Sequence, residues 1–189
     1  MNIKFKTMKF SYFIISLALM AGQYSLTAQI KQVKKTDSKK REDDFGKAIF
    51  SAFVNGDKNA WIALYPTNDE YKAILQAGLA AKAEGLTQQK IDEILVRRNK
   101  EAAAAYSTLF DGYSRMADSL GIQRGKSVFE KFDFNFVYPE PVKLKYLEAT
   151  IWFRCGKRHY AMDGIQAVAV KTGYRLQALT NIVQVDDGD

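Results

Sequence analysis

Glu148, His159 and Asp163 are the residues whose types and spacing could support acid–base chemistry. They fall where polar and apolar residues alternate, so one face of a β-hairpin would carry all three, with Glu148 opposite or diagonal to Asp163. Two carboxylates that close would share a proton, and one of them would then suit general acid–base catalysis. The alternative is an ordinary solvated sheet face, where charged side chains belong, and we favour this alternative.

Tyr146, Trp152 and Arg154 would lie on the same face and are the candidate ligand-binding side chains. Arg154 and His159 together would provide a contact for an anion. The segment 152–160, WFRCGKRHY, mixes basic and aromatic side chains at the tip of the predicted hairpin. Such a tip could contact a protein partner, an anionic sugar or a lipid headgroup. The alternative is an exposed hairpin whose charges only aid solubility.

The chain has one histidine, His159, and one cysteine, Cys155, which excludes several kinds of chemistry. No internal disulfide can form, a zinc site could draw at most one ligand from each type, and nothing visible orients a Cys–His pair for nucleophilic catalysis. Residues 121–127, GIQRGKS, lack the first glycine of a phosphate-binding loop and are predicted to connect a helix to a strand. We expect no metal and no cofactor, and we assign the aspartates of residues 186–189 to an acidic chain end.

Four helices are predicted to support this sheet. Apolar residues recur at helical spacing before residue 121. Thr67 and Glu70 have the spacing of a capping box, Asp57 and Thr87 are further N-caps, and a Gly follows the first, third and fourth helices. The predicted helices occupy residues 43–54, 58–64, 68–84 and 88–120.

After Gly125 the apolar pattern changes to strict alternation, which predicts strands. The predicted strands occupy residues 131–138, 143–154, 158–170 and 174–183. The turns between them are short, so neighbouring strands run antiparallel. Helices followed by such a meander predict an α+β fold, with N-terminal helices packed on a curved four-stranded antiparallel sheet.

A predicted turn at Cys155 and Gly156 determines which residues share a face of the sheet. One face would pack against the longest helix and form the core. It would carry Leu147, Ala149, Ile151, Phe153, Tyr160, Met162, Val168, Val170 and Leu176. The opposite, mixed face would carry Tyr146, Glu148, Thr150, Trp152, Arg154, His159, Ala161 and Asp163.

Two segments resemble the NTF2-like superfamily, also described as cystatin-like. Residues 45–66, FGKAIFSAFVNGDKNAWIALYP, are similar to its first helical pair, and residues 159–179, HYAMDGIQAVAVKTGYRLQAL, to its closing hairpin. The resemblance implies a cone-shaped domain with a pocket between a curved sheet and the helices. It also implies either an isomerase or dehydratase or a binding domain. The carboxylate or His–Asp pair of NTF2-like enzymes has no match in this sequence.

The start of the chain predicts export. Lys4, Lys6 and Lys9 precede an apolar run, residues 10–21, and small residues come before Gln29. This order is typical of a cleavable signal peptide over residues 1–28, and the run is too short for a membrane span. No Cys follows the apolar run, so a lipoprotein is not expected. The mature chain is therefore expected in the periplasm or secreted.

The rest of the chain divides by composition. Residues 29–42 are charged and without an apolar period, which predicts a flexible tether; residues 43–183 form a single domain and residues 184–189 an acidic tail. The net charge falls from +7 to +4 without the leader, because the leader holds three lysines and no acid. The folded domain is thus nearly balanced, and we expect no nucleic-acid partner.

Three functions remain compatible with these residues. The first is a non-enzymatic domain that binds an unknown small molecule or protein partner. The second is a small pocket enzyme that uses Asp163 or Glu148 in isomerase- or dehydratase-like chemistry. The third is a homodimer formed through the open sheet face. A mixed face that is enclosed with the helices would favour the enzyme, and a solvent-exposed mixed face would favour the binding domain. An apolar, self-complementary face would favour the dimer.

Overall fold

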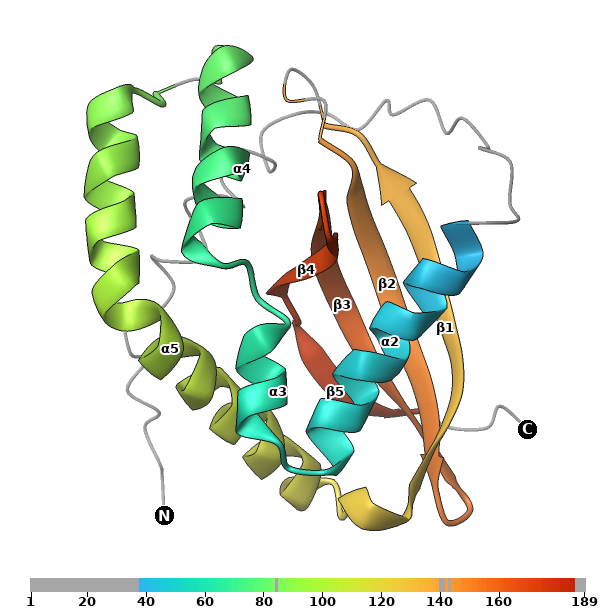
Figure 1. Ribbon diagram of the computed structural model, residues 1–189. Coiled ribbons are helices and arrows are strands. Elements are labelled where there is room, and N and C mark those ends of the chain that lie inside the picture. Colours follow the sequence, from blue (N-terminus) through green and yellow to red (C-terminus); the bar gives the residue numbers. More distant parts are fainter. Residues whose placement is uncertain (1–37, 84, 140–141, 143, 186–189) are drawn as a thin grey trace, which may run out of the picture.

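The computed structural model describes residues 38–83, 85–139, 142 and 144–185. The predicted signal peptide and residues 29–37 of the predicted tether lie outside the described residues. Helices come first and an antiparallel sheet follows, so the predicted α+β class is confirmed (Figure 1). The helices are α2 (Ser38–Val54), α3 (Lys58–Ala63), α4 (Asn68–Ala80) and α5 (Gln88–Ser119). The strands are β1 (Ser127–Val137), β2 (Tyr146–Cys155), β3 (Arg158–Val170), β4 (Gly173–Ala178) and β5 (Asn181–Val185).

The helix starts follow the predicted caps. The Asp57 carboxylate accepts a hydrogen bond from the Ala60 N–H at the start of α3. Thr67 and Glu70 form the complete capping box of α4, and the Thr87 hydroxyl accepts from the Lys90 N–H at the start of α5. Each cap satisfies a backbone donor that the first turn of a helix cannot pair by itself.

The first helix begins earlier than predicted, at Ser38, so residues 38–42 belong to α2 and not to the tether. The cause is Glu42, a charged residue that is predicted to belong to the tether because its sequence neighbours are also charged. Its side chain is only 1% exposed and accepts a hydrogen bond from the Tyr174 hydroxyl of β4 at 2.6 Å. A partner 132 positions away therefore extends the helix beyond its apolar pattern.

The sheet runs β1-β2-β3-β4 and every pairing is antiparallel, with β5 as an additional neighbour of β3. The predicted single strand over residues 174–183 is wrong, because the chain breaks at Leu179 and Thr180 into β4 and β5. The two strands pair with different halves of β3, β4 with residues 166–170 and β5 with residues 159–163. Residues 184 and 185, expected in the tail, complete β5.

A bulge in β3 explains this division. Ile151 pairs with Met162 and Ala149 pairs with Ile165, so Asp163 and Gly164 together face a single residue of β2. Gly164 has φ +67°, a conformation that glycine adopts without strain. The extra residue of the bulge shifts the alternation of β3 by one position. Every side chain after the bulge therefore points to the face opposite to the one that strict alternation predicts.

The predicted core face is confirmed for β2 and for the part of β3 before the bulge, and it is wrong for the part of β3 after the bulge. The side chains from Leu147 to Phe153 that were expected inside are buried, as are Tyr160, Met162 and Leu176. After the bulge, Ile165 and Ala167 occupy the core in place of Val168 and Val170. Val168 is buried on the opposite face, where it pairs with Tyr146.

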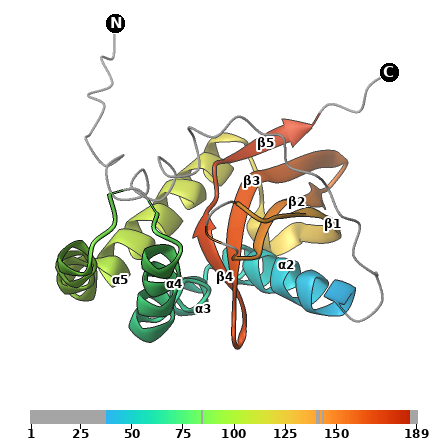
Figure 2. The ribbon, with the colours of Figure 1, turned by 90° about the horizontal axis from the view of Figure 1, so that it is seen from above.

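Helix α2 covers the core face of the sheet (Figure 1). Its Phe50 and Phe53 rings contact Phe153 of β2 at centroid distances of 5.5 and 6.4 Å. The longest helix, α5, was expected in this place; it contributes Phe110, Tyr113 and Ala117 to the same core. Its second half contacts α3 and β5, and Arg98 of its first half contacts α4. Viewed from above, the sheet is twisted, and the β3–β4 hairpin extends toward α4 (Figure 2).

Candidate functional site

Glu148 and Asp163 lie on the face of the sheet that points away from α2, and both are exposed. Glu148 is opposite Gln166, whereas Asp163 sits in the β3 bulge and accepts a hydrogen bond from the Thr150 hydroxyl at 2.7 Å. Thr150, which faces Asp163, is two residues from Glu148, so Glu148 lies diagonal to Asp163, one of the two arrangements expected. The hydrogen-bond partner of Asp163 is the Thr150 hydroxyl.

His159 and Arg154 are directly opposite one another on β3 and β2. Both contact Glu130, which lies in the β1 bulge: the distance is 3.0 Å from His159 Nδ1 to Glu130 Oε2 and 3.8 Å from Arg154 Nε to Glu130 Oε1. The expected anion contact of Arg154 and His159 is therefore occupied by a carboxylate of the chain itself. Glu130 was missed by the sequence analysis, because a bulge does not follow the alternation that places strand residues.

Trp152 is half-buried beside Ala161, its partner on β3, and the Lys131 Nζ lies 4.9 Å from the centre of its ring. Tyr146, at the other end of β2, is also half-buried. Burial, with a smaller contribution from Tyr71 of α4, raises the pKa of Tyr146. The candidate ligand-binding residues are thus spread along the strand and do not converge on one point.

The space between α2 and the sheet is filled by side chains. The aromatic ring of Phe153 stacks on Tyr160 at 5.4 Å, and Trp61 of α3 contacts Phe110 and Tyr113 of α5 at 5.5 and 5.6 Å. The largest fully buried side chains are Trp61, Tyr160, Phe53, Phe153, Ile49, Ile91, Leu147, Ile151, Met162, Ile165, Leu176 and Ile182. A pocket enzyme needs an interior with converging polar groups, and this interior is apolar and packed.

A buried carboxylate, Glu42, lies at the upper end of this core and was missed because its sequence neighbours are charged. Besides the bond from Tyr174, it has the Lys145 Nζ at 3.6 Å from Oε1, while Oε2 is buried without a hydrogen-bond partner. The Lys145 Nζ also lies 3.6 Å from the centre of the Phe136 ring. Burial first, and then the bond to Glu42, raises the pKa of Tyr174 far above its usual range. This group attaches the start of α2 to β4.

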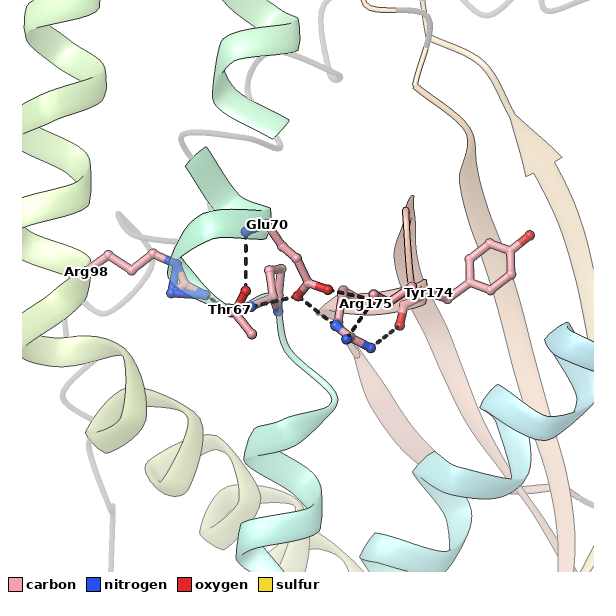
Figure 3. Close-up of polar contacts among 7 residues, drawn as sticks. Thr67, Glu70, Arg98, Tyr174 and Arg175 are labelled. Atoms are coloured by element: carbon pink, nitrogen blue, oxygen red, sulfur yellow. Dashed lines mark hydrogen bonds and ion pairs between the residues drawn. The ribbon is translucent and has the colours of Figure 1, made fainter. Parts of the chain in front are cut away.

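A second polar group joins α4 to β4 (Figure 3). Glu70 accepts from Arg175 Nε at 2.8 Å and from the Thr172 hydroxyl at 2.8 Å, in addition to the Thr67 backbone N–H of the capping box. Burial alone raises the pKa of the Glu70 carboxyl, but these hydrogen bonds, led by that from Arg175, outweigh burial and lower it to about 2. The carboxylate is fully used in holding the two elements together.

Arg98 of α5 is 2% exposed, and none of the ion pairs among the described residues includes it. It donates to the Pro66 carbonyl and to Asn68 Oδ1, and its guanidinium lies 4.5 Å from the centre of the Tyr71 ring. Carbonyl dipoles and an aromatic face thus replace a counter-ion. Arg98 attaches α5 to the loop between α3 and α4 (Figure 3).

A hollow at the lower end of the molecule combines two segments that the sequence analysis treated separately. The connector between α5 and β1 provides one wall, and the β2–β3 hairpin tip provides the other. Its volume is about 380 Å³ and its lining residues are Gly121, Gln123, Lys126, Cys155, Gly156, Lys157, Arg158 and Tyr160. We call this group of residues the basic hollow. The connector is confirmed as a helix-to-strand link, with a short 3₁₀ helix at Arg124–Lys126.

Comparison with known proteins gives no match: no family model, no curated protein and no solved structure is similar to this chain. Among the described residues, no three His, Cys, Asp or Glu side chains are grouped so that they could hold a metal ion. Within the same part of the chain, no helix has both the length and the apolar character that crossing a membrane requires.

Proposed function

We propose that this protein is an exported, non-enzymatic binding domain with an NTF2-like cone whose interior has become a packed core. The observation that carries the proposal is the filled space between α2 and the sheet, where Phe53, Phe153 and Tyr160 are almost fully buried. A ligand or partner must then be bound on the outer surface.

The polar residues support the same conclusion. The candidate carboxylates Glu148 and Asp163 are exposed, and the buried Glu42 and half-buried Glu70 are engaged by Tyr174 and Arg175. General acid–base catalysis needs a positioned group with free access to a substrate in a partly dry site. None of these four carboxylates combines access with a dry site. The mixed sheet face exposes the charged residues Glu148, Arg154 and Asp163, which also favours surface binding over a self-complementary apolar dimer contact.

Export is proposed from the leader sequence, and it can be measured directly. We expect that expression of the full chain in a bacterial host yields a periplasmic or secreted protein, whose first residue by intact-mass measurement is Gln29. Replacing Leu17 and Leu19 of the apolar run by Asp should retain the protein in the cytoplasm. A mature protein that keeps its leader and remains cytoplasmic would contradict the proposal.

Binding without catalysis is tested by a thermal-shift screen of the mature protein against metabolites and glycans. We expect a ligand that raises Tm and is recovered chemically unchanged by mass spectrometry after incubation. The double variant Glu148→Gln, Asp163→Asn should leave the ligand intact in the same way. If the wild-type protein converts the ligand and the double variant does not, the enzyme alternative is correct.

A further inference from the structure

The basic hollow has the size and shape of a site for a small polar group. Its volume of about 380 Å³ lies at the lower end of the range of about 300–1,000 Å³ found for ligand pockets. Two backbone turns form its walls, and Gly121 and Gly156 at these turns have φ +70° and +64°. The walls are therefore built by short, tightly turned segments, and long side chains extend from them.

The charge of the hollow is unbalanced. Lys126, Lys157 and Arg158 line it, and none of these side chains forms an ion pair or hydrogen bond with another described residue. Arg175 and Lys58, by contrast, have carboxylate partners in Glu70 and Asp111. Three like charges around one hollow repel each other, and this cost is offset when an anion binds between them.

Two carbonyl groups that would repel an anion beside the hollow already accept hydrogen bonds. The end of α5 presents carbonyl oxygens with partial negative charge. The Leu120 carbonyl accepts from the Tyr160 hydroxyl at 3.4 Å, and the Gln123 carbonyl accepts from the Lys126 N–H at 2.8 Å and from Cys155 Sγ at 3.5 Å. Two carbonyls beside the hollow thus have donors of their own, and three cationic side chains line the same space.

We propose that the basic hollow binds the phosphate group of a small phosphorylated ligand. The guanidinium of Arg158 provides a planar pair of donors that matches two phosphate oxygens, and Lys126 and Lys157 add two ammonium groups from opposite walls. This inference deepens the proposed binding function and rests on it. The phosphate can belong to a soluble ester or to a lipid headgroup, since both present the same group.

Cys155 provides a reporter inside the site, because it lines the hollow and is the only cysteine of the chain. The test measures the rate at which N-ethylmaleimide, an uncharged reagent, modifies this thiol in the mature protein. The probes are inorganic phosphate, glycerol 3-phosphate and phosphatidylcholine vesicles with and without phosphatidic acid. We expect phosphate probes to slow the reaction about fivefold or more, while chloride at equal ionic strength has no effect.

Two triple variants with equal charge change separate the site from general electrostatics. Lys126→Gln, Lys157→Gln, Arg158→Gln should weaken phosphate protection about tenfold or more. Lys47→Gln, Lys72→Gln, Lys171→Gln changes exposed side chains on other elements and should preserve protection. Calorimetric titration with glycerol 3-phosphate should show the same ranking without relying on the thiol.

The outcomes distinguish a soluble phosphate ester from a lipid headgroup, and they separate the phosphate site from the more general binding function. Protection by glycerol 3-phosphate indicates a soluble ester, and protection only by phosphatidic acid vesicles indicates a lipid headgroup. No protection and no heat with any phosphate probe, or equal loss in both variants, overturns the phosphate site. If an unphosphorylated ligand from the thermal-shift screen still binds in that case, the proposed binding function stands without this site.

Discussion

At the residue scale, the charged groups of this domain act mainly as connectors. Glu42 contacts Tyr174, Glu70 contacts Arg175, and Arg98 contacts the Pro66 carbonyl, so each of these charges joins two elements that are distant in sequence. The buried charges Glu42 and Arg98 are tolerated because such partners replace water. The cations of the basic hollow are exposed and join no elements, and we assign them to a ligand because three of them line one hollow.

Glu70 allows this connecting role to be measured through pH. Its pKa is lowered from 4.5 to about 2 in the folded protein, so the unfolded chain binds the proton more tightly. The stabilisation from Glu70 is therefore fully present above pH 4.5 and is lost as the pH falls to about 2. Urea unfolding at a series of pH values should show this loss in the wild-type protein.

The variant Glu70→Gln should lack that part of the acid dependence and lose about 1–2 kcal/mol of unfolding free energy at pH 7, because the capping box and the Arg175 ion pair are weakened. Glu101→Gln, an exposed position on α5, is the matched control and should change little. Equal acid sensitivity of wild type and Glu70→Gln would show that Glu70 does not connect α4 and β4 in this way.

At the element scale, the close approach of α2 to the sheet depends on Gly46. A Cβ atom at this position would lie 2.6 Å from the Phe132 ring of β1. Glycine lowers the propensity of a helix interior, and here the lost propensity is offset by tight packing. The absence of a side chain at Gly46 thus allows α2 to pack closely against β1.

Substitution of two helical glycines tests this argument. Gly46→Ala should lower the unfolding free energy by about 1–2 kcal/mol, because the overlap with Phe132 exceeds the gain of about 1 kcal/mol in helix propensity. Gly112→Ala in α5, where a Cβ meets nothing within 4 Å, should raise it by about 0.5–1 kcal/mol. Urea unfolding measures both, and stabilisation by both substitutions would exclude a tight contact at Gly46.

At the scale of the whole molecule, the β3 bulge decides the shape of the domain. It places β4 and β5 on different halves of β3, and it puts Ile165 and Ala167 in the core in place of Val168 and Val170. The Thr180 N–H donates to the Asp163 carbonyl at 3.1 Å, and a Cβ on Gly164 would lie 2.2 Å from Thr180 Oγ1. The break between β4 and β5 and the bulge are thus one structural feature.

Gly164→Ala should destabilise the protein by about 2 kcal/mol or more, because alanine is strained at φ +67° and overlaps with Thr180. Thr180→Gly removes the overlapping atoms but not the strain. The double variant should therefore be more stable than the sum of the two single effects, by about 1 kcal/mol in a double-mutant cycle. Strict additivity would show that Gly164 and Thr180 are not in close contact.

Short-range sequence patterns correctly predict the local features of this protein. The caps at Asp57, Thr67 and Thr87, the change to alternating residues after Gly125 and the third strand at residues 158–170 are all confirmed. These features depend on hydrogen bonds and side-chain spacing within a few residues, which a sequence pattern contains. The α+β class followed from them because helices come before strands.

Contacts between distant parts of the chain account for the burial of Glu42, the bulge at Gly164 and the meeting of residues 121–127 with the 152–160 hairpin tip. The groups involved are Tyr174 with Glu42, Thr180 with Gly164, and Cys155 with Gln123. A one-residue bulge reverses the faces of all later residues on its strand, so a local pattern cannot carry the assignment past it. The basic hollow likewise depends on a long-range contact, because its two walls are more than 25 residues apart in the chain.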